Sequence, residues 1–192
     1  MEELKVDIAI ISKQGEDSEN YQKFNKIVKQ KRIKVVVVNE GDRIKVEENV
    51  YFDILWPNNS QLISENILNN NSLVCKLNYK NFSMLFTGDI EEIAEKEILK
   101  EYKGELDILG STLLKVAHHG SKTSSIQEFL DSVKPKIALV GVGKDNKFGH
   151  PNDEVIKRLE NDGCKIYRTD KMGEISISVN YKEKIKVKKF IK

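Results

Sequence analysis

From about residue 84 onward, apolar runs alternate with stretches whose apolar residues recur at helical spacing. Such an alternation of strands and helices is typical of parallel strands joined by covering helices. The amino third is instead richer in apolar runs joined by short turns, which favour hairpins. We therefore predict the α/β class, with a mixed sheet and flanking helices. The expected strands of the alternating part are 82–86, 113–117, 136–142, 165–170 and 174–179, and the expected helices are 90–102, 125–133 and 152–163.

The amino third and the carboxyl tail give further expectations. The lysine-rich tail at 181–192 alternates with apolar residues, which is typical of an exposed strand edge and favours that structure over a DNA-binding arm. The β-branched run at 34–38 predicts a buried strand. The other expected segments are a strand at 6–11, a helix at 18–30 opened by Ser18, a hairpin of 43–46 with 50–56, a long polar loop at 58–71, and a strand at 72–79 that pairs with 82–86.

Composition limits the function classes. A chain of 192 residues suits one ordinary domain. Charged residues make up 32% of it, but the formal net charge is only +2, which predicts no strong field for nucleic acid. No apolar run approaches the roughly 20 residues that span a bilayer, and no secretory signal is present, so we expect a soluble chain. Cys75 and Cys164 lie in apolar patterns without CxxC spacing, so buried free thiols are expected in preference to a disulfide or a metal site.

Two adjacent histidines stand at the end of an expected strand. The apolar run at 113–117 leads directly into His118, His119 and Gly120, where glycine lets the backbone turn at once. The remaining histidine, His150, follows the apolar run at 137–142. All three histidines therefore fall at strand ends or in loops. The carboxyl ends of strands are where α/β sheets usually bind their ligands.

Asp89, His118, His119 and His150 are the candidate metal ligands. Carboxylate and imidazole together suit a divalent ion such as Zn²⁺ or Mn²⁺. Each residue also has a structural interpretation, since Asp89 could cap a helix, one histidine of the pair could be structural, and His150 could cap the turn at Pro151. Their common position at strand ends favours the metal interpretation for the group as a whole.

Other catalytic arrangements have weaker support. Ser121 lies near His119, but no Gly-x-Ser-x-Gly elbow and no Walker-type phosphate loop occurs in the chain. The sequence contains no His-x-His and no His-x-x-x-His. Four ligands are also few for a two-metal hydrolytic site, whose ions lie about 3.5–4 Å apart and share bridging groups.

Six sequence blocks, in order between residues 71 and 178, are similar to one protein family. The blocks are Asn71–Val74, Leu85–Glu91, Leu114–Ser124, Val133–Lys136, Val142–Pro151 and Tyr167–Asp170. With them the chain resembles the carboxyl-terminal part of the metallo-β-lactamase-like domain of ComEC-type DNA-internalisation competence proteins. The resemblance implies the later half of an αββα sandwich. It also implies hydrolysis of phosphodiesters, DNA above all, in connection with DNA uptake, and a membrane-anchored parent protein.

The resemblance also implies roles for individual residues. Asp89 matches the family's metal-bridging aspartate, while a histidine of the pair His118–His119 and His150 match its later histidine positions. Asp89, His119 and His150 would form the catalytic set, with up to two divalent ions, Zn or Mn, in the complete domain. Asn71 stands where many relatives carry a histidine, and would position a loop or a ligand water. The implied phosphate-binding residues are Ser121, Thr123 and Ser124, with the N–H groups of the helix that they open.

One departure from the family pattern is large. The first metal motif, His-x-His-x-Asp-His, is absent, and the chain begins about where that motif would end. We therefore expect residues 1–192 to form a single, incomplete metallo-β-lactamase-like domain, either an excised piece or a split gene product. The isolated chain is then expected to be inactive, and an upstream half of the same domain or a dimer mate would complete it. The alternative is a non-catalytic structural or partner-binding half-domain.

Overall fold

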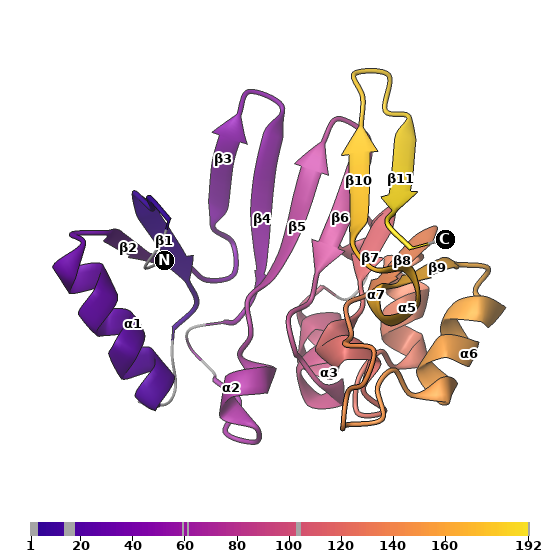
Figure 1. The fold of residues 1–192 in the computed structure, drawn as a ribbon, viewed down its shortest axis with the longest axis horizontal. Coiled ribbons are helices and arrows are strands. Elements are labelled where there is room, and N and C mark those ends of the chain that lie inside the picture. The colour runs from indigo at the N-terminus through magenta and orange to yellow at the C-terminus, as the bar shows by residue number, and fades with distance from the viewer. Residues whose placement is uncertain (1–3, 14–17, 59, 61, 103–104, 192) are drawn as a thin grey trace.

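A seven-stranded mixed sheet forms the centre of the protein in a computed structural model, which describes residues 4–13, 18–58, 60, 62–102 and 105–191 (Figure 1). The strand order is β3-β4-β5-β6-β7-β8-β9, so each strand pairs with its neighbour in sequence. The strands are β3 (Arg43–Glu47), β4 (Val50–Trp56), β5 (Val74–Tyr79), β6 (Phe82–Phe86), β7 (Leu113–Lys115), β8 (Ile137–Val140) and β9 (Lys165–Arg168).

The sheet changes character at β6. Strands β3 to β6 pair antiparallel, whereas β6 to β9 pair parallel. Each parallel step needs a crossover, and helices supply it. The crossovers contain α3 (Glu92–Glu101), α4 (Leu106–Leu109), α5 (Gln127–Val133) and α6 (Asp153–Asn161). The predicted α/β class with a mixed sheet and flanking helices is confirmed, and the carboxyl ends of β6 to β9 lie at one edge.

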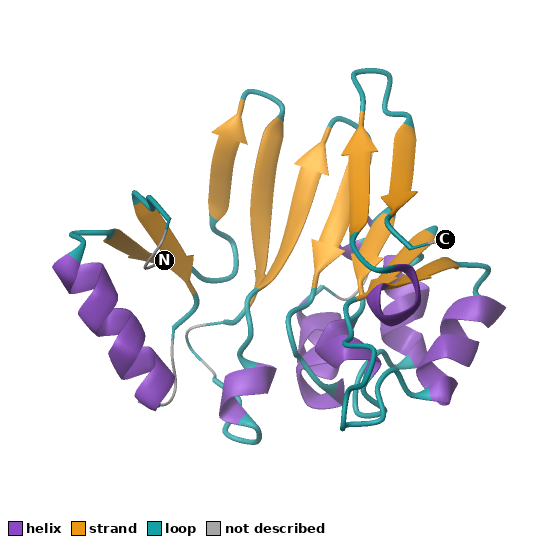
Figure 2. Ribbon diagram, viewed as in Figure 1, coloured by secondary structure: helices purple, strands orange, loops and turns teal. Residues whose placement is uncertain are grey.

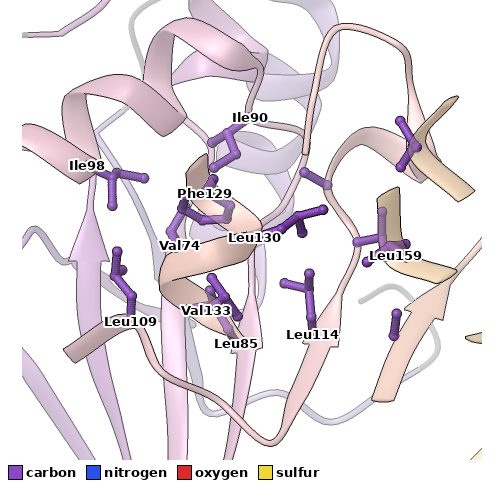
Figure 3. Packing of buried hydrophobic residues seen from close by; sticks show 14 of the residues in the cluster. Val74, Leu85, Ile90, Ile98, Leu109, Leu114, Phe129, Leu130, Val133 and Leu159 are labelled. Atoms are coloured by element: carbon purple, nitrogen blue, oxygen red, sulfur yellow. The ribbon is translucent and has the colours of Figure 1, made fainter. Parts of the chain in front are cut away.

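The core lies between the sheet and the crossover helices (Figure 3). Leu85 of β6 and Leu114 of β7 point toward Phe129 and Leu130 of α5, and all four are almost fully buried. Ile98 of α3 and Leu159 of α6 extend the same cluster. Burial of these apolar side chains, worth about 25 cal/mol per Å², fixes the helices against the parallel strands.

The carboxyl tail forms an antiparallel ribbon of β10 (Ile175–Val179) and β11 (Ile185–Lys189), as Figure 2 shows. Lys80 Nζ, in the turn between β5 and β6, donates to Tyr181 O at 2.8 Å and attaches the ribbon tip to the sheet. Exposed lysines alternate with half-buried apolar residues along β11, so the predicted strand with an exposed lysine-rich face is confirmed for the described residues of the tail, which end at 191.

A separate unit precedes the central sheet. In the part of the chain that the structure describes, strands β1 (Ile8–Ile11) and β2 (Lys34–Val37) pair parallel with each other and with no other strand, and α1 (Glu19–Gln30) lies between them in sequence. Ser18 caps α1 as predicted, its side chain accepting from the Tyr21 N–H at 3.2 Å. The prediction of a buried strand at 34–38 is wrong in one respect. Val35 and Val37 are exposed, because among the described residues β2 pairs with β1 alone and not with the central sheet.

Other differences concern short elements. The polar loop at 58–71, of which 59 and 61 lie outside the described residues, contains α2 (Ile67–Asn70). Neither α4 nor α7 (Thr169–Met172) was expected, and four-residue helices carry too few residues to show a periodicity. Both cysteines are free thiols; Cys164 is buried as predicted, whereas Cys75 is only half-buried, and its partial burial raises its pKa to about 11. Within the described ranges, no helix is long and apolar enough to cross a membrane.

Candidate metal-binding edge of the sheet

Three neighbouring parallel strands bring the four candidate ligands to one edge. Asp89 follows β6, His118 and His119 follow β7, and His150 lies in the connection after β8. The His118 ring centroid lies 6.4 Å from that of His119 and 5.7 Å from that of His150. His119 Nε2 lies 3.8 Å from Asp89 Oδ1. The structure thus gathers all four residues, which lie up to 61 positions apart in the chain.

The histidine pair has an uncommon backbone conformation. His118 and His119 both have positive φ, 46° and 56°, inside a short 3₁₀ turn, η1 (Ala117–Gly120). Residues other than glycine rarely adopt positive φ, which costs about 1–3 kcal/mol for each residue. Residues in such conformations cluster at functional sites. Hydrogen bonds maintain the turn, since His118 N–H donates to Gly88 O at 3.1 Å and Ser121 N–H donates to His118 O at 2.9 Å.

Gly120 closes this turn and offers a test of its packing. Its φ is +81°, and a Cβ added there would lie 2.6 Å from Pro151 Cβ. Gly120→Ala is therefore expected to lower the free energy of unfolding by about 1–3 kcal/mol, measured by urea denaturation. Gly143→Ala is the matched control, because a Cβ there would meet nothing within 4 Å. Equal stability of the two variants would refute the packing constraint at Gly120.

The orientation of His119 leaves one nitrogen directed at Asp89. His119 Nδ1 lies 2.6 Å from Gly141 O, and because a carbonyl only accepts, Nδ1 must carry a proton. In the neutral form of the ring, Nε2 is therefore unprotonated and faces the Asp89 carboxylate. Two electron-rich groups facing each other at 3.8 Å favour a shared cation, which can be a proton or a metal ion.

His150 has its own electrostatic environment. Burial lowers its pKa, the charges of His118 and His119 lower it further, and Asp89 opposes them. Its ring stacks on Phe148, with centroids 5.9 Å apart. A lowered pKa favours the neutral imidazole, which is the form that binds metal ions.

These residues have the chemistry of a metal site but not a complete one. In the ranges that the structure describes, no group of three or more His, Cys, Asp or Glu side chains is placed to hold an ion. The four donors lie at one edge of the sheet, and His119 Nε2 and Asp89 Oδ1 face each other at 3.8 Å. A catalytic zinc ion needs three protein ligands and an open position. The arrangement in this conformation therefore requires further donors, or closer approach of these, before it can bind an ion firmly.

Sequence reasoning missed Glu91, which lies two residues after Asp89 and is buried. Its Oε1 accepts from Thr123 Oγ1 at 2.8 Å and lies 3.3 Å from His118 Nδ1. The sequence shows a glutamate next to the first turn of a helix, which the helix dipole already explains. Nothing in the local pattern distinguishes this carboxylate from the exposed Glu92 beside it.

Asn71 holds the loop that precedes β5. Its side chain accepts from Ile63 N–H at 3.0 Å, and donates to Ile63 O at 2.8 Å and to Ile67 O at 2.6 Å. The residue is buried, at 3% exposure. These contacts use both ends of the amide, so Asn71 fixes the loop before β5.

The hydroxyl and N–H groups of the expected phosphate site make hydrogen bonds within the protein. Ser124 Oγ donates to Ala117 O and Ser121 O, and its side chain is fully buried. The Ser121 and Thr123 hydroxyls bond to each other at 3.0 Å. Helix α5 starts at Gln127, not at residue 125 as predicted. The N–H groups of Ser125 and Ile126, just before α5, donate to the Glu95 carboxylate, so these groups are not free for phosphate in this conformation.

Glu95 is a buried carboxyl with a testable titration. Burial raises its pKa from 4.5 to about 7, while the N–H groups of Ile126 and Ser125 and the charge of Arg158 oppose the shift. At a pH between these two pKa values, Glu95 keeps its proton in the folded chain and has lost it in the unfolded chain. The contribution of Glu95 to stability is therefore present at low pH and is lost as pH rises from about 4.5 to about 7.

The difference between wild type and Glu95→Gln isolates this titration. From pH 4.5 to 7, the wild type should lose on the order of 3 kcal/mol of unfolding free energy relative to the variant, which does not titrate. Urea unfolding at several pH values measures it, with the exposed Glu128→Gln as the control. Parallel pH curves for wild type and Glu95→Gln would show that Glu95 ionises normally.

Comparisons with known proteins show that the chain is similar to competence proteins. It is 29% identical over 164 residues to ComE operon protein 3 of Bacillus subtilis (strain 168), which covers 85% of this chain and 20% of that protein. It is 32% identical over 132 residues to Competence protein ComA of Neisseria gonorrhoeae, covering 69% and 18%. It is 30% identical over 131 residues to Recombination protein 2 of Haemophilus influenzae, covering 68% and 16%.

The chain spans about a fifth or less of the length of these relatives. No family model matches it. A solved structure of a protein from Parabacteroides distasonis, named as a proposed metal-dependent hydrolase, has a TM-score of 0.48 and 14% identity, covering 86% of this chain and 77% of that one. The resemblance drawn from the six sequence blocks is confirmed by the curated relatives: this chain is similar to one segment of the ComEC-type competence proteins.

Proposed function

We propose that this chain supplies part of a metal-dependent hydrolase site that acts on phosphodiesters, DNA above all, in a competence protein of the ComEC type. The observation that carries the proposal is the gathering of Asp89 and all three histidines at the carboxyl edge of β6, β7 and β8. Similarity to competence proteins supports DNA as the substrate class.

The residues present divide the work of such a site. Asp89 provides a half-exposed carboxylate, and His119 presents an unprotonated Nε2 toward it, fixed by Gly141 O. His150, whose pKa is lowered by burial and by the other histidines, adds a third donor from a different strand end. A bound divalent ion, Zn²⁺ or Mn²⁺, would activate water and polarise the phosphodiester. Asp89, His119 and His150 are the residues we propose for catalysis, with His118 as a fourth donor.

The donor set is too small for this chemistry, so we propose that groups from outside residues 1–192 complete it. The sequence lacks His-x-His-x-Asp-His, and two-metal sites need more ligands than the four gathered here. An upstream half of the same domain, or a dimer mate, would bring them. In this proposal residues 1–192 are one incomplete metallo-β-lactamase-like domain, which is inactive by itself.

A nuclease assay on linear DNA tests the proposal. The chain alone should leave DNA intact with Mn²⁺ or Zn²⁺, whereas the chain mixed with a segment that carries His-x-His-x-Asp-His should degrade it. Asp89→Asn in the same mixture is the inactive control. If the two parts associate, as seen by size-exclusion chromatography, and DNA is still not degraded, the hydrolase proposal fails.

A non-catalytic, partner-binding half-domain is the competing function. The observation in its favour is that the four donors do not form a three-ligand group in the described residues. The two functions differ in metal stoichiometry of the associated parts, because a hydrolase site would hold two ions and a purely structural partner none.

A further inference from the structure

The Glu91 carboxylate accepts hydrogen bonds from two separate parts of the chain, the segment with Asn66 and Asn70 and the turn with Thr123. Oε1 accepts from Thr123 Oγ1 at 2.8 Å, and Oε2 accepts from Asn66 Nδ2 at 2.8 Å. Asn70 Nδ2 lies 3.5 Å from Oε2, and Asn70 Oδ1 accepts from the Glu91 N–H at 3.0 Å. The side chain is only 12% exposed. A carboxylate held this firmly has a fixed position, from which it can orient a neighbouring group.

His118 is that neighbour. Its Nδ1 lies 3.3 Å from Glu91 Oε1, and its side chain is 23% exposed. Of the buried side-chain nitrogen and oxygen atoms in the described part of the chain, His118 Nδ1 alone has no hydrogen bond, since the 3.3 Å contact is not aligned as one. The 3.3 Å separation is already close to hydrogen-bond distance, so alignment requires a change of orientation and not of position.

We infer that Glu91 is a positioning residue, whose carboxylate accepts a proton held on His118 Nδ1 and leaves His118 Nε2 unprotonated at the metal-binding edge. A carboxylate accepts only, so the nitrogen that faces it must donate. Carboxylate partners of this kind fix the tautomer and the ring orientation of metal-binding histidines. That His118 binds a metal ion through Nε2 rests on the proposed function, whereas the position of the proton on Nδ1 does not depend on it.

The two histidines of the pair are oriented by different groups. His119 is oriented by a backbone carbonyl, Gly141 O, and His118 by a carboxylate. Both rings therefore hold the proton on Nδ1 and present Nε2. The pair acts as two donors of the same kind, of which only His118 depends on an ionised side chain.

Nitrogen NMR of the metal-free chain tests this directly. At about pH 8, where an unperturbed imidazole is neutral, the nitrogen shifts and two-bond couplings of ¹⁵N-labelled chain should show His118 protonated on Nδ1. In Glu91→Gln, the ratio of the Nδ1–H to the Nε2–H form should fall by about tenfold, since a charge-assisted hydrogen bond becomes a neutral one. His119 should stay on Nδ1 in both proteins.

Two further variants separate positioning from structural loosening. Thr123→Val removes one donor to Glu91 but keeps the carboxylate, so the His118 tautomer should not change. Glu92→Gln changes the neighbouring, exposed carboxylate, which is the first residue of α3 and pairs with Lys96, and should leave both tautomers unchanged. If His118 is protonated on Nε2 in the wild type, or keeps its ratio in Glu91→Gln, the inference is overturned. If Glu91→Gln does not fold, the test rests on the wild type and Thr123→Val, and His118 protonated on Nε2 in either protein would overturn the inference.

Metal affinity distinguishes this inference from the proposed function. In the chain completed by a His-x-His-x-Asp-His segment, Glu91→Gln should weaken Zn²⁺ binding by about 10–100-fold, as loss of such carboxylate partners does. A wild-type mixture that binds no Zn²⁺ would defeat the proposed function and leave the tautomer result standing. Normal Zn²⁺ binding by Glu91→Gln, with an altered tautomer, would show that His118 is not a ligand.

Discussion

Asp89→Asn is expected to abolish metal binding and nuclease activity of the completed site while leaving the fold intact. Asp89 supplies the only carboxylate among the four gathered donors, and an amide in its place carries no negative charge and binds a divalent ion poorly. Mutating a residue that merely hydrogen-bonds to a metal ligand lowers metal affinity by about 10–100-fold. Loss of the ligand Asp89 itself should lower the affinity by more than that. Calorimetric titration with Mn²⁺ and Zn²⁺ measures it.

The stability of Asp89→Asn should change by less than about 0.5 kcal/mol, because the side chain is 43% exposed. Asp145→Asn, an exposed aspartate in the connection that also carries His150, is the matched control and should keep metal binding. Unchanged metal affinity or activity in Asp89→Asn would remove Asp89 from the site.

Phe129→Ala should cause the largest loss of stability of any substitution considered for this chain, about 3–5 kcal/mol. Phe129 is 1% exposed and lies in the core between α5 and the sheet, with Leu85 and Leu114 of the central strands in the same cluster (Figure 3). Its removal leaves a cavity that the packed strands cannot fill. Guanidinium unfolding followed by circular dichroism measures the cost.

Phe148→Ala is the control for the aromatic truncation. Phe148 is 82% exposed and contacts the ring of His150 by stacking, so its loss should change stability by less than about 0.5 kcal/mol. A cost below about 1 kcal/mol for Phe129→Ala would mean that α5 does not pack on the sheet as the structure shows.

The sequence was sufficient for the central sheet and for the gathering of the donors. Apolar runs at 113–117 and 136–142 gave β7 and β8, and the order of strands and helices implied that their carboxyl ends share an edge. The position of Asp89 and the histidines at that edge then followed from where each strand ends. The spacing of apolar residues and the order of strands and helices can both be identified directly in a single sequence.

Contacts between distant segments could not be predicted in this way. The burial of Glu91 and Glu95 depends on segments 30 to 32 residues further along the chain, at Thr123, Ser125 and Ile126. For the same reason, the sequence suggested a phosphate at the hydroxyl-rich turn, where a carboxylate of the protein already lies. The exposure of Val35 depends on which strand pairs with β2, and an apolar run does not specify its partner.

Metal content is the measurement that tests the central claim most directly. The purified chain should be analysed for Zn and Mn by elemental analysis, alone and after mixing with a segment that carries His-x-His-x-Asp-His, followed by removal of unbound ions. We predict no firmly bound metal in the chain alone and up to two ions in the associated parts. Two ions in the chain alone would contradict the account of an incomplete site, and an associated complex without metal would contradict its assignment as a metal site.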